Sequence, residues 1–105
     1  MDKLLGLLGM ARKAGRLTAG YDATAALIAR GRARVVLVSG DVSEKTLKEL
    51  NFTKEKYENP VPIYTLETGK EELSDRTGYR NPVAVLSTED AGFAKAIIKC
   101  IIHNS

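Results

Sequence analysis

Residues 34–38 read Arg34-Val35-Val36-Leu37-Val38, a continuous apolar run rich in β-branched side chains. A strand of this composition is typically buried on both faces, as in a parallel or mixed sheet that helices cover. A second run over residues 61–65 predicts another strand, and its Pro62 places it at a sheet edge or a strand start. Residues 83–86 predict a further strand, and residues 16–18 a short extended segment.

Helical patterns fill the intervals between these strands. The apolar spacing of Leu4, Leu5, Leu8 and Ala11 predicts an amphipathic first helix. The predicted helices cover residues 2–14, 21–29, 42–50, 68–78 and 88–102, with one more helical turn at 53–57. The sequences Asp41-Val-Ser-Glu44 and Thr68-Gly-Lys-Glu71 resemble capping boxes, so they place helix N-caps at Asp41 and Thr68.

Strands that alternate with helices in this way predict an α/β protein. We expect a three-layer α/β/α sandwich around a small four-stranded mixed sheet. A chain of 105 residues is near the commonest domain size, so residues 1–105 are expected to form one domain.

Positive charge is concentrated in one part of the chain. Residues 12–34 contain six lysines and arginines against the single acid Asp22, a net charge of +5. The whole chain carries +3, so the remainder is net negative. A focused positive field attracts polyanions, which makes RNA, DNA and anionic membranes the candidate partners.

The residues that catalysis or metal binding needs are scarce. His103 is the only histidine and Cys100 the only cysteine, so the sequence has no catalytic triad and no zinc-ligand spacing. Cys100 is expected to be a small core residue, and neither a metal ion nor a cofactor is predicted. The apolar runs are too short to span a bilayer and a signal peptide is not evident, so we expect a cytoplasmic protein with no membrane partner.

The junction before the second helix is the best candidate for a binding site. Gly20 allows close approach of a ligand to the backbone, and the amides of a helix start attract phosphate. Asp22 either stabilises the helix dipole or accepts hydrogen bonds from a guanine edge. Arg16, Arg30, Arg32 and Arg34 would contact phosphates. Tyr21 and Tyr79 would either stack on bases or lie half-buried in the surface.

These residues also carry a resemblance. The stretches Leu7–Gly20, Arg30–Val38 and Asp41–Glu44, followed by the strands at residues 61–65 and 83–86, resemble the kink-turn RNA-binding superfamily of ribosomal proteins. Within it, the chain is most similar to the bacterial YlxQ-like branch. The resemblance implies a three-layer α/β/α fold and a non-enzymatic, ribosome-associated protein that docks structured, kink-turn-like RNA. It also implies ribosomal proteins as a second class of partner.

The resemblance implies a site formed by residues 18–24 and 78–82, and the charge of Arg16 extends its first part to residues 16–24. The residues expected to contact RNA are Arg16, Thr18, Ala19, Gly20, Tyr21, Asp22, Thr24, Arg34, Tyr79, Arg80, Asn81 and Pro82. The chain departs from the family pattern at Ala19, Ala23 and Ala26, which replace a basic residue, a glutamate and a lysine. These alanines leave an alternative open, a protein-interaction module on the same fold that has lost specific RNA recognition.

Overall fold

Helices and strands alternate along residues 2–103, which is the part of the chain that the computed structural model describes. The elements in this part, in chain order, are α1 (Asp2–Lys13), β1 (Thr18–Ala19), α2 (Tyr21–Ala29), β2 (Val35–Val38), α3 (Glu44–Lys56), β3 (Ile63–Thr65), α4 (Lys70–Thr77), β4 (Val85–Thr88) and α5 (Ala91–His103). None of these helices is both long and apolar enough to cross a lipid bilayer.

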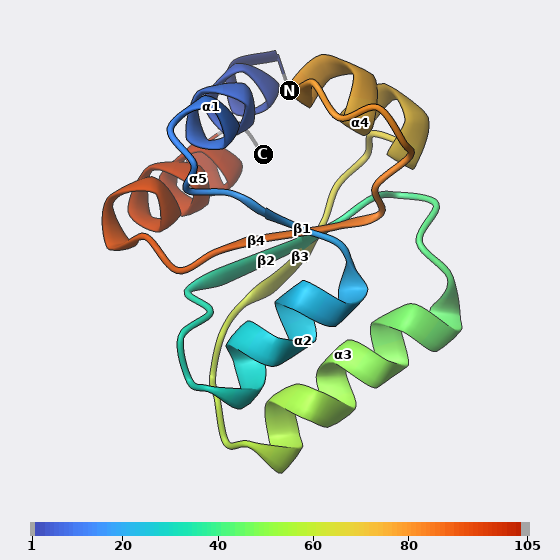
Figure 1. Ribbon diagram of the computed structural model, residues 1–105, viewed down its shortest axis with the longest axis vertical. Coiled ribbons are helices and arrows are strands. Elements are labelled where there is room, and N and C mark those ends of the chain that lie inside the picture. Colours follow the sequence, from blue (N-terminus) through green and yellow to red (C-terminus); the bar gives the residue numbers. More distant parts are fainter. Residues whose placement is uncertain (1, 104–105) are drawn as a thin grey trace.

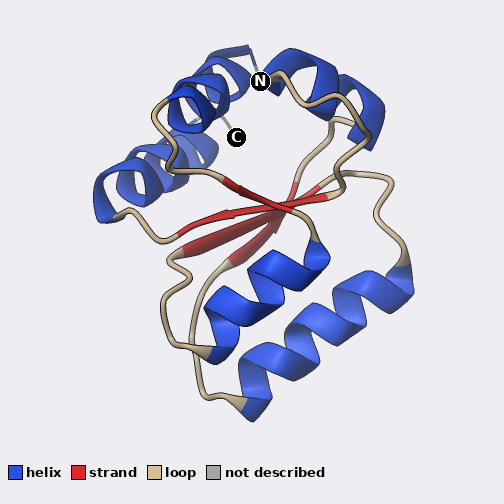
Figure 2. Ribbon diagram, in the orientation of Figure 1, coloured by secondary structure: helices blue, strands red, loops and turns tan. Residues whose placement is uncertain are grey.

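The four strands form one mixed sheet in the order β1-β4-β2-β3. Strand β4 pairs antiparallel with both β1 and β2, while β2 pairs parallel with β3. Helices α2 and α3 cover one face of this sheet, and α1, α4 and α5 cover the other (Figures 1 and 2). The predicted α/β/α sandwich is therefore confirmed, and so is the edge position of the strand that follows Pro62.

Strand β2 separates two hydrophobic clusters. All four of its side chains are buried, as the sequence predicts for a strand covered on both faces. Val35 and Leu37 pack with leucines of α1 and with Ile97 of α5. Val36 and Val38 pack on the opposite side, with residues of α2 and α3. Because side chains alternate along a strand, one apolar run fills both halves of the core.

Several boundaries differ from the predicted ones. Strand β4 begins two residues later than predicted. The amide of Val83 donates a hydrogen bond to the hydroxyl of Ser74 and therefore does not pair with a neighbouring strand. Helix α3 runs without interruption through residues 44–56, so the separate turn at 53–57 is its last turn. Helix α5 starts at Ala91 because Thr88 still belongs to β4.

Both predicted capping boxes are wrong in detail. Ser43 caps α3, accepting a hydrogen bond from the amide of Thr46 at 3.1 Å. Asp41 lies further upstream and its Oδ1 accepts from the amide of Lys70 at 2.9 Å, so it stabilises the start of α4. The same oxygen accepts from the hydroxyl of Ser39 at 2.7 Å. Thr68 does not cap α4, and the N-cap position belongs to Gly69.

The hydrogen bonds to Asp41 make the stability of the fold depend on pH. The Ser39 hydroxyl and then the Lys70 amide hold the pKa of Asp41 below its usual range. A carboxylate with a depressed pKa stabilises the fold above its unfolded-state pKa, and this contribution is lost as pH falls through the folded-state value.

We therefore expect Asp41→Asn, which keeps an acceptor but removes the charge, to lower the free energy of unfolding at pH 7. The deficit should shrink as pH falls below about 4, where the carboxylate of the unfolded chain becomes protonated, and it should be smallest below the lower pKa of the folded state. Urea unfolding at several pH values measures this. Asp75→Asn is the matched control, since Asp75 is exposed near the other end of α4. A constant deficit from pH 7 to pH 2 would contradict the assignment.

Candidate nucleic-acid interface

The start of α2 and the loop before β4 lie at the same end of the sheet. The amide of Gly20 donates to the carbonyl of Val85, the first residue of β4, at 2.8 Å. The chain enters Val85 directly from the loop that follows α4 (Figure 1), so this hydrogen bond brings the end of that loop to the start of α2. We call residues 19–23 and 78–82 together the α2-start surface.

The first turn of α2 presents free backbone donors. Gly20 is the N-cap with a φ of 100°, a left-handed value that strains any residue with a side chain. Within residues 2–103, no side chain caps this helix start. Asp22 and Ala23 beside it are exposed, and the first amides of a helix have no partner within the helix. Such amides, at the positive end of a helix dipole, bind phosphate oxygens.

Tyr21 is only half exposed. Its ring packs against the cluster between the sheet and α2 and α3. The structure therefore favours the half-buried interpretation of this tyrosine, with one edge at the α2-start surface.

The loop after α4 is fixed by the end of that helix. Gly78 is in the left-handed conformation, and the amides of Gly78 and Tyr79 both donate to the carbonyl of Ser74, at 2.9 and 2.8 Å. The Arg12 guanidinium lies over the Tyr79 ring, 4.9 Å from its centroid. Burial raises the pKa of Tyr79, while the charge of Arg12 opposes that shift. Because Arg12 covers one ring face, a base has at most the opposite face on which to stack.

Arg80, Asn81 and Pro82 follow this tyrosine and are all exposed. They place a cation, an amide and a rigid turn residue at the α2-start surface. Arg12 adds a second cation from α1. Sequence reasoning counted Arg12 in the basic segment but did not assign it to the site, because only the packing of α1 on α4 brings it to Tyr79.

Thr24 does not belong to this surface. Its side chain is fully buried, and its hydroxyl is hydrogen-bonded to that of Ser87 in β4 at 2.8 Å. The prediction that Thr24 contacts RNA is therefore wrong for its side chain. Thr18 and Ala19 are half-buried in β1, where they pair with Ser87 and Leu86.

Arg16 and Arg34 lie at the other end of β4. The hydroxyl of Thr88, the last residue of that strand, donates to the carbonyl of Arg16. The amide of Arg34 donates to the carbonyl of Thr88 at 2.9 Å. Since a strand rises about 3.3 Å per residue, roughly 10 Å of β4 separates this end from Val85. The sequence interpretation placed Arg16 and Arg34 in one site with Gly20 and Tyr79. In the structure these two arginines lie at the opposite end of β4 from Gly20.

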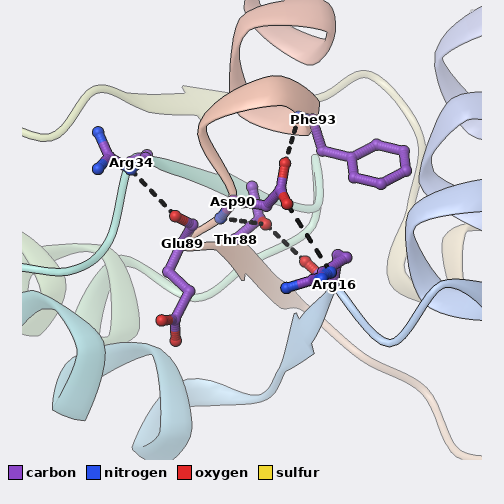
Figure 3. A network of polar contacts seen from close by, with 6 residues as sticks. All are labelled: Arg16, Arg34, Thr88, Glu89, Asp90 and Phe93. Atoms are coloured by element: carbon purple, nitrogen blue, oxygen red, sulfur yellow. Dashed lines mark hydrogen bonds and ion pairs between the residues drawn. The ribbon is translucent and has the colours of Figure 1, made fainter.

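Carboxylates accompany the arginines at this end (Figure 3). Arg16 lies 3.8 Å from a carboxylate oxygen of Asp90, and Arg32 lies 3.3 Å from one of Glu89. Asp90 also accepts from the amide of Phe93 at 2.8 Å, which caps α5. The positive charge of the basic segment is thus partly compensated here.

In the described part of the chain, no group of three or more potential metal ligands is arranged to hold an ion.

The buried pair of hydroxyls gives a stability prediction. Thr24→Val preserves the volume of the side chain but leaves the Ser87 hydroxyl without its partner. We expect the free energy of unfolding to fall by about 1–3 kcal/mol, the cost of an unsatisfied buried polar group. Adding Ser87→Ala should recover part of this loss, and urea unfolding of the parent protein and of these two variants measures it.

Thr65→Val on the exposed part of β3 is the matched control and should leave stability nearly unchanged. If Thr24→Val were as stable as the parent protein but failed to bind RNA, the hydroxyl of Thr24 would be a binding group and not a structural one.

The chain is similar to known proteins over most of its length. The RNA-binding protein YlxQ of Enterococcus faecium is 36% identical over 94 residues, which cover 90% of this chain and 86% of that protein. A Bacillus halodurans structure, described as that of a protein with unknown function, matches with a TM-score of 0.83 at 26% identity, covering 96% of this chain and 98% of the other.

A 15.5 kD RNA-binding protein of Giardia lamblia has the same fold, with a TM-score of 0.74 at 18% identity over 96% of this chain and 82% of that one. Residues 2–98 match the family described as ribosomal protein L7Ae/L30e/S12e/Gadd45. A match over nearly the whole length settles the family, and the chain belongs to the ribosomal protein L7Ae/L30e/S12e/Gadd45 family.

Proposed function

We propose that this chain is a non-enzymatic RNA-binding protein that docks structured, kink-turn-like RNA on the α2-start surface. The observation that carries the proposal is the uncapped start of α2, which the Gly20–Val85 hydrogen bond joins to the end of the exposed loop containing Arg80. Membership of a ribosomal protein family and the name of the Enterococcus relative support RNA as the partner. The RNA is expected to be ribosomal or another structured RNA, with ribosomal proteins as neighbours.

The groups on this surface divide into phosphate and base contacts. The amides at the start of α2 receive a phosphate oxygen, and Arg12 and Arg80 add positive charge on the side of the loop. Asp22 is exposed in the first turn, where its carboxylate accepts from the N1 and exocyclic amine of a guanine. Phosphate contacts set affinity and salt dependence, whereas base contacts select the RNA.

The alanines on α2 limit how much of the RNA the helix reads. Ala23 and Ala26 are both exposed, so neither supplies a hydrogen bond to a ligand on this side. Base recognition then depends on Asp22 and on the backbone. The alternative function, a protein-interaction module, predicts that the same surface has no preference among RNAs.

Arg80 provides the first test. We expect Arg80→Gln to weaken binding to a kink-turn RNA and to lower the slope of log affinity against log salt by about one, since one phosphate contact is lost. Arg30→Gln is the matched control, because Arg30 is exposed at the opposite end of α2. Fluorescence anisotropy across a salt series measures both variants.

A straight RNA duplex of equal length completes the experiment. The proposal expects the parent protein to prefer the kink-turn at moderate salt. Equal losses for Arg80→Gln and Arg30→Gln, with no preference between the two RNAs, would mean that the protein acts only as a diffuse positive charge. Absence of binding to either RNA would support the protein-interaction alternative.

A further inference from the structure

Helix α5 has a buried face and an exposed face, and the exposed face is not part of the proposed RNA site. Its Ala94, Ile97 and Cys100 are buried in the core. Ala91, Lys95, Ile98 and Ile102 follow one another at spacings of four, three and four residues, which places them along another face of the helix. Ile98 is half-buried, and Ile102 is 57% exposed.

This face forms the floor of a groove of about 660 Å³. Its apolar part is made by Ala91, Ile98 and Ile102, and its cations are Lys95, Lys99 and Arg34. Within residues 2–103, no aspartate or glutamate side chain lines it. The groove therefore combines an apolar strip with positively charged side chains and, within residues 2–103, no negatively charged ones.

Within residues 2–103, no carboxylate forms an ion pair with these cations. The Arg34 side chain is held by the backbone carbonyl of Glu89 at 3.0 Å, and the carboxylate of Glu89 extends away from it (Figure 3). That carboxylate pairs with Arg32 instead. Among the residues that the structure describes, no carboxylate lies within ion-pairing distance of Lys95 or Lys99. This differs from the basic cluster around Arg16 and Arg32, where acids are close.

We infer that the groove binds an acidic amphipathic helix of a partner protein. A helix in a groove uses apolar side chains at helical spacing as anchors, and Ile98 and Ile102 offer them a surface. Carboxylates along the edge of that helix complement Lys95, Lys99 and Arg34. RNA fits less well, because a sugar–phosphate backbone would pair with the cations but leave the isoleucine strip covered by polar groups. Thirteen residues of α5 span about 20 Å, enough for a partner helix of three to four turns.

The position of the groove separates it from the RNA site. Helix α5 lies on the face of the sheet opposite to α2 (Figure 2). The groove and the α2-start surface therefore share no residue. The inference stands independently of the proposed RNA function, since it rests on a different helix and different side chains.

A display experiment tests the inference without requiring that the partner be identified first. A library of random 16-residue peptides is selected on the folded protein, with counter-selection on the Lys95→Glu/Lys99→Glu variant. The peptides retained should be net negative, with apolar residues three and four positions apart. A fluorescein-labelled copy of the most enriched peptide should lose at least about tenfold in affinity with Lys95→Glu/Lys99→Glu and with Ile102→Ser.

Lys45→Glu/Lys48→Glu on α3 is the matched control, because it makes the same charge change on exposed side chains of the other face and should alter affinity less than about twofold. Thermal unfolding confirms that each variant is folded. Failure to enrich peptides over the counter-selected variant, or enrichment of peptides without negative charge, overturns the inference. It is also overturned if Lys95→Glu/Lys99→Glu weakens kink-turn RNA binding as much as Arg80→Gln, because the groove is then an RNA surface.

Discussion

The antiparallel pairing of β4 with both β1 and β2 is the constraint on which the arrangement of this protein depends. It sets Gly20 beside Val85 at one end of the strand and Arg34 beside Thr88 at the other. The hydrogen bond between the buried hydroxyls of Thr24 and Ser87 then holds α2 on the same strand. Because Gly20 is held at Val85 and Thr24 at Ser87, the first turn of α2 is fixed at this end of the sheet, with Asp22 and Ala23 exposed.

The two ends of β4 consequently differ in chemistry. At the Val85 end, free amides lie close to exposed polar side chains and to cations that come from separate elements. At the Thr88 end, arginines lie next to Glu89 and Asp90, and the capping role of Asp90 joins that cluster to α5. Surface ion pairs of this kind contribute little to stability, but they reduce the charge offered to a polyanion. Net charge along the sequence is thus a poor guide to where an anion binds.

Much of the fold could be predicted from local pattern, since the run Val35–Val38 requires burial on two sides and Pro62 requires an edge. Details set by distant partners could not be predicted. Asp41 caps a helix that starts 29 residues later, and Arg12 reaches Tyr79 through the packing of α1 on α4. For the site, Gly20 and the loop at 78–82 could be placed together from the resemblance. Burial of Thr24 and the remote position of Arg16 and Arg34 depend on strand register, which composition and spacing do not encode.

We propose that the Val85 end of β4, and not the basic segment as a whole, forms the RNA surface. Mapping backbone amide chemical shifts by NMR during titration with a kink-turn RNA tests it most directly. We expect the largest changes in residues 19–23 and 78–82, with small changes in residues 32–34 and 89–90. Changes concentrated around Arg32, Arg34 and Glu89, with Gly20 and Arg80 unaffected, would contradict it.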